Sequence, residues 1–511
     1  MPAAHFLVNP LAGRERVSVK GRPFIPCILI VALAWPLSAA GQTSQGQSPQ
    51  SSSSSSGGQQ STPGIQGYQV PSQSVFLGGV PSGTATSDVI TVTVLDAINR
   101  ALEHNLGVLV SEQGIGRSSG ARWRALSGLL PNINAKVTET REEINLQAFG
   151  FGSFGSAFAG IPIVVGPFNV FDARVYLQQS VLDLGTLNRT RSEQHNVEAS
   201  RHTYQRARDL VVHVAGILYI QALAATARAD AARTQKDTAE ALYNQAVDLK
   251  QNGLIAGIDV LRAEVELATS TQRVTSTAND LEKSKLQLAR AIGLPPGQRF
   301  QLDDNLPDLP SPDLTLEEAV GRAYRRPDYQ AALERIRAAE LARRAIVGDN
   351  LPSVKVSADY GDIGLSPSDS HSTFTLVGEL NVPIFQGGKT KGRLMEADAD
   401  LRDRRAEADD LKSSIYYEVQ SAFLDLRATG ELLQVAIKTR DLATQQLGQA
   451  RDRFGAGVAN NLDVVQAQAS LAAATEQYIS ARYGYDLAKG ALIRGIGTTE
   501  EVFRQILGGS R

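Results

Sequence analysis

Apolar residues recur at helical spacing over most of the chain between Thr91 and Gly497, and Pro is absent from the longest of these stretches. The pattern predicts one long helix in each half of this region, each leading into a medium helix that returns. A helix of 65 residues is about 100 Å long, which no compact domain encloses, so we expect the long helices to pack in coiled coils. The expected helices cover residues 106–127, 186–251 and 259–292 in the first half and 328–347, 389–454 and 463–496 in the second.

The last of these helices has the three-four spacing of a coiled-coil seam. Glu476 interrupts it once, and Ala positions are frequent, which lets neighbouring helices approach closely. The seam residues are Leu462, Val465, Ala469, Ala472, Ile479 and Tyr483.

Four stretches instead alternate apolar and polar residues, as strands do. The apolar sets are Ile133, Ala135 and Val137; Phe171, Ala173, Val175 and Leu177; Val354, Val356, Ala358 and Tyr360; and Phe374, Leu376, Leu380 and Val382. An antiparallel sheet with one wet face has this alternation, and so does a β-barrel with lipid outside and water inside. A phenylalanine cluster favours the barrel, since aromatic girdles flank membrane strands. It consists of Phe149, Phe151, Phe154, Phe158, Phe168 and Phe171.

The chain repeats itself, which indicates an internal duplication. Segments 92–105, 129–137, 178–189, 253–267 and 288–293 match, in the same order, 314–327, 350–358, 381–393, 457–471 and 492–497. We therefore expect a first repeat over residues 91–310, a second over 311–497 and a C-terminal tail over 498–511.

The passage from strand to long helix is abrupt in both repeats. In the second repeat "NVPIFQGGKTKGR" contains Pro383, Gly387 and Gly388, and in the first "QQSVLDLGTLNR" contains Gly185. Pro cannot donate to a strand ladder, and Gly adopts conformations that other residues avoid. We expect "NVPIF" to be the last span of a strand and the glycines to turn the chain from sheet to helix.

The N-terminus has the order of a secretory signal, with basic residues, then "IPCILIVALAWPL", then Ser38-Ala39-Ala40. We expect residues 1–40 to be a signal peptide and residues 41–90, which are rich in Ser, Gln and Gly, to be a disordered tether. Cys27, the single cysteine, lies in the signal, so the mature chain has no thiol chemistry. No other stretch approaches 18 consecutive apolar residues, which leaves a β-barrel as the route into a membrane.

Composition argues against several classes of function. A formal net charge of −2 without a basic block argues against nucleic-acid binding. His195 and His202 lie seven residues apart with no carboxylate cluster in the sequence beside them, so we expect no metal site. "GFGSFG" is followed by Pro162 and Pro167 rather than by a helix, so it predicts a surface loop rather than a nucleotide site. We expect no catalysis and no cofactor.

Four strands cannot close a barrel, and an open edge in hydrocarbon leaves backbone groups unpaired. A membrane role therefore requires several copies, eight strands in a dimer or twelve in a trimer. Only the larger barrel leaves an open lumen, so a conduit favours the trimer.

The repeated "LxxAxxxAxxxN" opener, the "VPIFQGG" junction and the "GxxxxxDVxxAxxxL" hairpin resemble the TolC-like outer-membrane efflux duct family. The resemblance covers roughly 91–497. It implies an α+β membrane protein: a homotrimer with a 12-stranded transmembrane β-barrel in the outer-membrane lipid, continuous with a long periplasmic α-helical coiled-coil barrel. It also implies a periplasmic adaptor (membrane fusion) protein and an inner-membrane pump as partners.

On this resemblance the helical tips are the turns at 251–259 and 454–463, where the family carries a Val-Gly-Leu-like element for adaptor contact. The corresponding residues here are Gly253 and Leu254 on the first tip and Gly457 and Val458 on the second. Some members close the tip with Tyr, Arg and paired Asp; the matching positions here are Phe454, Ala459, Asp463 and Gln466, so only Asp463 fits.

Asp259 and Asp463 each precede an apolar helical run. We expect each to be an N-cap, which accepts a hydrogen bond from a free amide, in preference to a pore-lining ring. One residue can be an N-cap and also belong to a pore-lining ring.

The sequence thus predicts a passive exit duct in the outer membrane of a Gram-negative-type bacterium, spanning into the periplasm and serving efflux or type I secretion. The alternative is a periplasmic or secreted coiled-coil scaffold without a pore, which has no need for apolar faces on all four strands.

Overall fold

The computed structural model describes residues 74–149, 162–303, 314–456, 458, 461–497 and 499–500. The chain divides into two compact units, Met1–Gly64 and Ile65–Arg511, and the described residues all belong to the second. The expected signal peptide, the first part of the tether, "GFGSFG" and residues 501–511 lie outside them.

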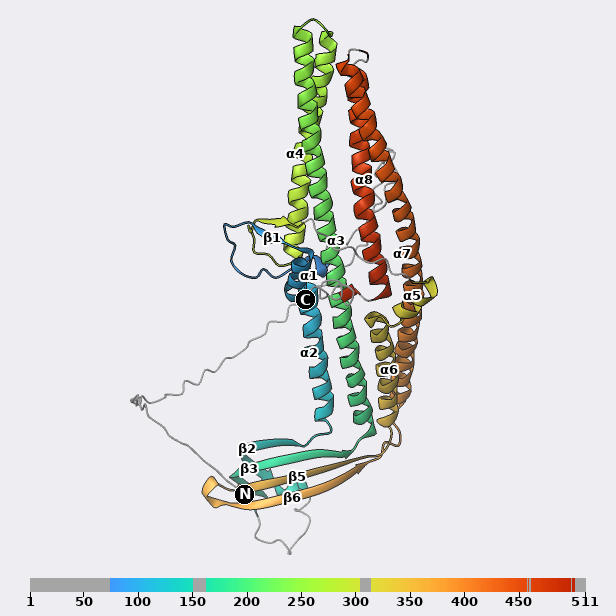
Figure 1. Cartoon of the computed structure of the whole chain (residues 1–511). Coiled ribbons are helices and arrows are strands. Elements are labelled where there is room, and N and C mark those ends of the chain that lie inside the picture. The colour runs from blue at the N-terminus through green and yellow to red at the C-terminus, as the bar shows by residue number, and fades with distance from the viewer. Residues whose placement is uncertain are drawn as a thin grey trace, which may run out of the picture. The chain divides into compact units, whose positions relative to one another are not determined.

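Two helices, two strands and two long helices follow one another in each half of this unit (Figure 1). The first half contains α1 (Val94–His104), α2 (Leu106–Ser127), β2 (Asn132–Asn145), β3 (Val164–Leu182), α3 (Leu184–Gln251) and α4 (Gly257–Ala291). The second contains α5 (Leu316–Ala323), α6 (Pro327–Gly348), β5 (Ser353–Gly364), β6 (Ser370–Asn381), α7 (Lys389–Gly455) and α8 (Asn461–Ile496). The predicted helices are confirmed, with ends no more than two residues from those expected.

Corresponding helices in the two halves begin in the same way. Thr93 caps α1 in a capping box with Asp96, and Thr315 caps α5 in a capping box with Glu318. In both, the threonine side chain accepts from the backbone N–H of the acidic residue, whose carboxylate accepts from the threonine N–H. The two openers matched in sequence therefore share a local structure.

The strands form one antiparallel sheet in the order β2-β3-β5-β6. Its register sorts the side chains by polarity: Val137 faces Ala173, Val175 faces Tyr360, and Tyr360 faces Phe374. The predicted apolar sets therefore share one face, on which Ile133, Val137, Phe374, Leu376 and Leu380 are 64 to 76% exposed. Among the described residues the edge strands β2 and β6 have no further strand partner.

Charged residues gather on the opposite face of the sheet. Arg174 on β3 binds Asp172 through both carboxylate oxygens and donates to Asp359 on β5 at 3.1 Å. These side chains are mostly shielded from solvent, and the charge of Arg174 is paired with two carboxylates, as a charge removed from water requires. One face of the sheet thus suits hydrocarbon and the other water.

Three expectations about the ends of elements need correction. β6 ends at Asn381, so residues 382–386 are not a strand, although Val382, Ile384 and Phe385 are β-formers. Of the phenylalanine cluster, Phe168 and Phe171 lie within β3, which starts earlier than expected. The seam predicted in α8 is wrong at its start, since Leu462 is 47% exposed while Val464 and Ala467 are buried.

The folded part begins before Thr91, so the expected tether over 41–90 is wrong for its last part. A short 3-10 helix, η1, spans Val75–Leu77, and the amide of Asn105 donates to the carbonyl of Phe76 at 2.7 Å. The side chains of Phe76 and Leu77 pack against the central core, and that contact offsets the entropy of ordering the segment.

The central core lies where α1, α4 and α8 surround the middle of α3, beside a small parallel sheet of β1 (Ile90–Val92) and β4 (Phe300–Leu302). The middle of α3 is apolar enough to cross a membrane by length and composition, but 78% of that window is buried within the unit. Tyr219 from this window is 1% exposed, and its hydroxyl lies within hydrogen-bond distance of the backbone oxygens of Val92 and Asp303. The window is therefore a core helix here.

Buried charges meet beside this core. Arg326, only 2% exposed, donates to both carboxylate oxygens of Asp328, to Glu418 at 2.7 Å and to the carbonyl of Gly495. Burial disfavours the charge of Arg326, but the carboxylates of Asp328 and Glu418 outweigh this and raise its pKa. One guanidinium thus joins α6, α7 and the end of α8.

Two titratable groups of α3 lie near this cluster. Burial raises the pKa of Asp209 to about 6, against the opposing hydrogen bond from the backbone N–H of Glu500 and the charge of Arg206. Burial lowers the pKa of His213 to about 3, and the charges of Arg494 and Arg206 act in the same direction.

Asp209 and His213 respond to acid in opposite senses. As the pH falls from 7 to 5, the unfolded chain protonates the histidine while the folded chain does not, which lowers the free energy of unfolding by about 2 kcal/mol. Over the same range the folded chain takes up a proton at Asp209, which raises the free energy of unfolding by about 1 kcal/mol.

We predict that Asp209→Asn makes the protein more sensitive to acid. Between pH 7 and pH 5 its free energy of unfolding should fall by about 1 kcal/mol more than that of the original protein. Denaturant unfolding in detergent at both pH values measures this difference. Asp237→Asn, at an exposed position on α3, is the control; equal falls for the two variants would contradict the raised pKa of Asp209.

Candidate functional site at the strand-helix junction and the helical tips

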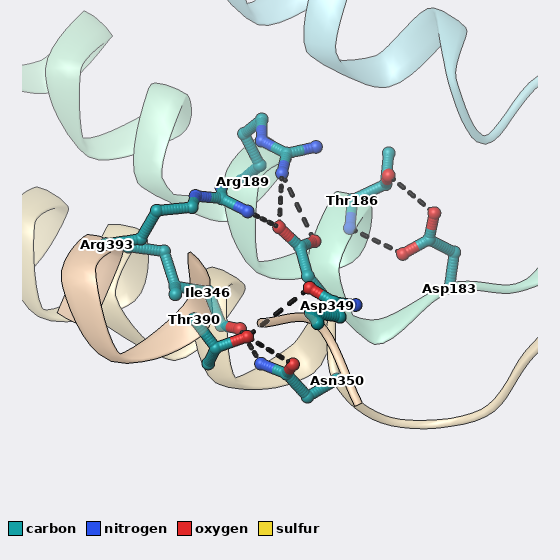
Figure 2. Close-up of polar contacts among 9 residues, drawn as sticks. Asp183, Thr186, Arg189, Ile346, Asp349, Asn350, Thr390 and Arg393 are labelled. Carbon is teal, nitrogen blue, oxygen red and sulfur yellow. Dashed lines mark hydrogen bonds and ion pairs between the residues drawn. The ribbon is translucent and has the colours of Figure 1, made fainter. Parts of the chain in front are cut away.

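The first junction is capped by Asp183. Its carboxylate accepts from the backbone N–H of Thr186 at 2.8 Å and from the hydroxyl of Thr186 at 2.7 Å (Figure 2). Partial burial acts to raise the pKa of Asp183, but these hydrogen bonds and the charge of Arg189 together outweigh it and hold the pKa below its ordinary value. The cap lets α3 begin two residues after β3 ends.

Two glycines bring the start of α3 against the end of α6. A Cβ on Gly348 would lie 2.6 Å from the backbone nitrogen of Gly185, and a Cβ on Gly185 would lie 2.0 Å from Oδ1 of Asp349. No other residue fits either position without displacing its neighbour. The structure thus places the junction residue Gly185 at a close approach between the two halves of the chain.

Asp349, which follows α6, joins both junctions. It accepts from Arg189 at the start of α3 at 3.3 Å and from Arg393 at the start of α7 at 2.9 Å (Figure 2). The adjacent Asn350 accepts from the hydroxyl of Thr390 at 2.6 Å. Sequence reasoning missed Asp349, because its partners lie 160 and 44 residues away.

The second junction relies on backbone conformation. Gly387 and Gly388 have φ values of 59° and 83°, and Gly388 is the N-cap of α7. Open space surrounds both Cα atoms, so these positions need glycine for its conformation rather than for its size. Pro383 lies in the segment between β6 and α7, where Ile384 and Phe385 are 94% and 88% exposed.

The tips lie at the far ends of the two helical hairpins, α3 with α4 and α7 with α8 (Figure 1). Gly253 has a φ of 73°, which turns the chain between α3 and α4. Leu254 and Val458 are 70% and 71% exposed. Gly457 lies outside the described residues. Both tips therefore present an apolar side chain to solvent.

The expectation that Asp259 and Asp463 are N-caps is wrong. The N-cap of α4 is Ala256, and Asp259 lies in the first turn, where it accepts from Arg262 at 3.2 Å. Asp463 lies in the first turn of α8, which begins at Asn461. Each helix starts two residues earlier than expected, so each carboxylate meets the positive end of the helix dipole from inside the helix.

The two hairpins of one chain are linked side by side. Near the tips, the side chain of Asn461 donates to the carbonyl of Asp259 at 2.8 Å. Further along, Arg228 on α3 donates to Glu476 at 2.8 Å and to Ser480 at 3.1 Å on α8. Between these links, α3, α4 and α8 line a cleft of about 820 Å³. A movement that separates the two hairpins along their length breaks both links.

His195 has a carboxylate partner that its own helix does not supply, since Nδ1 lies 2.6 Å from Glu334 on α6. His202 instead contacts Gln205 on its own helix. Within the described ranges, no group of three or more His, Cys, Asp or Glu residues lies together as metal ligands would.

Residues 323–498 match the family model described as "Outer membrane efflux protein". The chain is 23% identical over 350 residues to "Outer membrane protein TolC" of Escherichia coli (strain K12), covering 65% of this chain and 70% of that protein. It is also 23% identical over 439 residues to "Alkaline protease secretion protein AprF" of Pseudomonas aeruginosa, covering 81% of this chain and 86% of that protein. Residues 323–498 thus form a domain of the outer membrane efflux protein family, and TolC and other outer membrane efflux proteins are homologues of this chain.

The solved structure of the Campylobacter jejuni CmeC outer membrane channel has the same fold as this chain. The two superpose with a TM-score of 0.70 at 16% identity, over 86% of this chain and 97% of that one. The family thus accounts for a sheet joined directly to long helical hairpins.

We predict that Gly185→Ala destabilises this protein by about 1–3 kcal/mol, because the new methyl group displaces Asp349 from its arginine partners. Thermal unfolding in detergent measures the change. Gly392→Ala, in α7 with open space around the Cα atom, is the matched control and should be neutral or slightly stabilising. Equal effects of the two substitutions would contradict the close approach.

We predict that replacing Gly387 and Gly388 together by Val lowers the yield of folded protein, because a β-branched residue at positive φ costs about 1–2 kcal/mol or more at each position. Gly378→Val is the control, since Gly378 lies in β6 in open space and strands favour Val. Gel filtration in detergent and thermal unfolding compare the variants. Normal yield and stability of the double variant would show that the junction does not need these glycines.

Proposed function

We propose that this protein is the passive exit duct in the outer membrane of a Gram-negative bacterium, serving an efflux or type I secretion system. The observation that carries the proposal is the sheet: its apolar face is exposed, its other face holds paired charges, and it continues directly into helical hairpins. Lipid outside and water inside require this pair of faces. Family membership supports the same function.

The duct is a homotrimer in this proposal, with twelve strands closing a barrel. The unpaired edges β2 and β6 support it, because open edges in hydrocarbon leave N–H and C=O groups without partners. Exposed apolar residues on the helices support it as well. They follow α7 (Tyr417, Leu424, Val435 and Leu442) and α4 (Ile258, Leu261, Val265 and Leu286), elements at opposite sides of one chain's pair of hairpins. Burying them between copies closes a helical tunnel.

The halves of each copy are the products of an internal duplication in this proposal. The common element order and the two capping boxes support it. Three copies with two similar halves then give a tube with approximate sixfold regularity, in which each strand-helix junction continues the barrel into the tunnel.

Transport consists of opening the tips, and the chain itself performs no reaction. An adaptor protein of the periplasm contacts the tips at Gly253, Leu254, Gly457 and Val458, and an inner-membrane pump supplies the energy. The exposed Leu254 and Val458 fit such a contact. Opening requires breaking the links of Asn461 to Asp259 and of Arg228 to Glu476. In the trimer, three exposed Asp463 carboxylates near the tips attract cations.

We predict that the purified protein conducts ions in planar bilayers and prefers cations. Asp463→Asn should reduce the cation preference, measured as the reversal potential in a KCl gradient, because it removes one negative charge per copy at the narrow end. Asp237→Asn, an exposed carboxylate away from the tip of α3, should change it less.

Fractionation separates the duct from the alternative. Recovery of the mature protein as a soluble periplasmic species without detergent would refute the proposed duct function and favour a coiled-coil scaffold. Insertion without conductance under any condition that loosens the tips would leave a membrane-bound scaffold instead.

A further inference from the structure

Basic residues gather where each of four helices meets the sheet. No Asp or Glu stands in the sheet-proximal segments 117–127 of α2, 184–192 of α3, 341–348 of α6 or 389–395 of α7. The basic residues there, which we call the basic belt, are Arg117, Arg122, Arg124, Arg189, Arg191, Arg343, Arg344, Lys389, Lys391 and Arg393.

Internal ion pairs account for only part of the basic belt. Arg189 and Arg393 bind Asp349, and Arg343 binds Asp398. The others make no ion pair with any described residue, and all of these except the half-buried Arg122 are exposed. They are Arg117, Arg122, Arg124, Arg191, Arg344, Lys389 and Lys391.

Helix dipoles do not explain the basic belt either. A cation is favourable in the last turn of a helix, which fits Arg124 on α2, whereas Arg344 precedes the last turn of α6. The same effect disfavours cations in the first turn of a helix, yet Lys389 and Lys391 lie in the first turn of α7. An external anion at this level accounts for the cations that the helix dipoles do not favour.

Exposed apolar side chains stand in the same band. Trp123, between Arg122 and Arg124, is 60% exposed, and Ile384 and Phe385, just before Lys389, are 94% and 88% exposed. Aromatic rings beside basic residues are typical of the membrane-water interface, where the ring meets lipid and the cation meets phosphate.

The distance from the apolar sheet face fits the headgroup layer. Ile133, on the apolar face, is the second residue of β2, and Trp123 stands one helical turn before the end of α2. One turn is about 5 Å, and a headgroup layer is about 5–8 Å thick on each side of the hydrocarbon.

We propose that the basic belt binds the phosphate groups of anionic phospholipids in the periplasmic leaflet of the outer membrane. This rests on the proposed membrane insertion and adds a lipid partner to it. The unpaired cations anchor the barrel at a fixed depth, with Trp123, Ile384 and Phe385 between the headgroups. The junction stays at the membrane surface, and the tunnel stays perpendicular to it.

The test compares two variants of the mature protein with the same charge change. The belt variant carries Arg124→Gln, Lys389→Gln and Lys391→Gln. The control variant carries Lys250→Gln, Lys283→Gln and Lys438→Gln, at positions on α3, α4 and α7 that are likewise exposed and free of ion pairs with described residues. Both are reconstituted into vesicles of phosphatidylethanolamine with one-fifth phosphatidylglycerol, extracted in mild detergent and analysed by native mass spectrometry for retained lipid.

We expect the belt variant to retain about tenfold less phosphatidylglycerol than the original protein, while the control variant retains a similar amount to it. Retention of phosphatidylethanolamine should be equal in all three, and the difference should shrink at high salt.

Three results would overturn the proposal. Equal phosphatidylglycerol retention by belt variant and original protein, with normal conductance, means that the cations do not bind lipid. Equal loss in the belt and control variants means that net charge, not the belt, matters. A changed reversal potential with unchanged lipid retention places the cations in the lumen.

Failure of the proposed function gives a different result. A protein that enters no vesicles and never conducts refutes the duct itself, whatever its lipid retention.

Discussion

Close contact between long helices is the constraint on which the rest of the structure depends. Buried positions in α7 recur every seven residues: Leu401, Ala408, Ile415, Ala422, Thr429, Ala436 and Ala443. The same spacing holds in α8 (Ala467, Ala474, Ala481 and Ala488) and in α6 (Ala331, Ala338 and Ala345). A seven-residue repeat keeps one stripe facing the partner helix along a supercoil, and small residues let the backbones approach. A helix of 67 residues such as α7, about 100 Å long, depends for most of its stability on the packing of such a stripe.

The two halves of the chain connect sheet to helix through different interactions. The first half uses a carboxylate cap, Asp183, and a glycine that makes room, Gly185. The second uses Gly387 and Gly388, whose left-handed conformations redirect the chain. Asp349 then joins the two starting helices through Arg189 and Arg393. The matched motifs therefore conserve the path of the chain and not the interactions that hold it.

Local periodicity made the helices and strands predictable, whereas it gave no information on contacts between residues distant in sequence. Helices and strand faces follow from periods of 3.6 and 2, so 389–454 and the set around Tyr360 were found from sequence. Strand ends and helix starts were less accurate, because Asp is itself a favoured N-cap residue and moved the expected starts to Asp259 and Asp463. The role of Asp349 was missed because its partner Arg189 lies 160 residues away in the sequence. The close approach of Gly185 and Gly348 was missed because it also joins distant residues and depends on the distance between backbones. The role of η1 was missed because Val75, Phe76 and Leu77 follow a polar tract whose composition predicts disorder.

The junction has to fix the orientation of each long helix relative to the sheet as well as connect the two. A slip of one residue in a strand turns its apolar face inward, and a shift of one residue in a helix rotates its buried stripe by about 100°. The sheet face that carries Tyr360 and the α7 stripe that carries Ala408 must therefore keep a fixed phase relative to each other. A flexible connection loses that phase, whereas glycines with defined φ values and a carboxylate shared by two arginines keep it. Because the helices extend about 100 Å from the junction, a small rotation there becomes a large displacement at the tips. In the proposed trimer, the rigidity of the junction consequently determines whether the copies can meet along their full length.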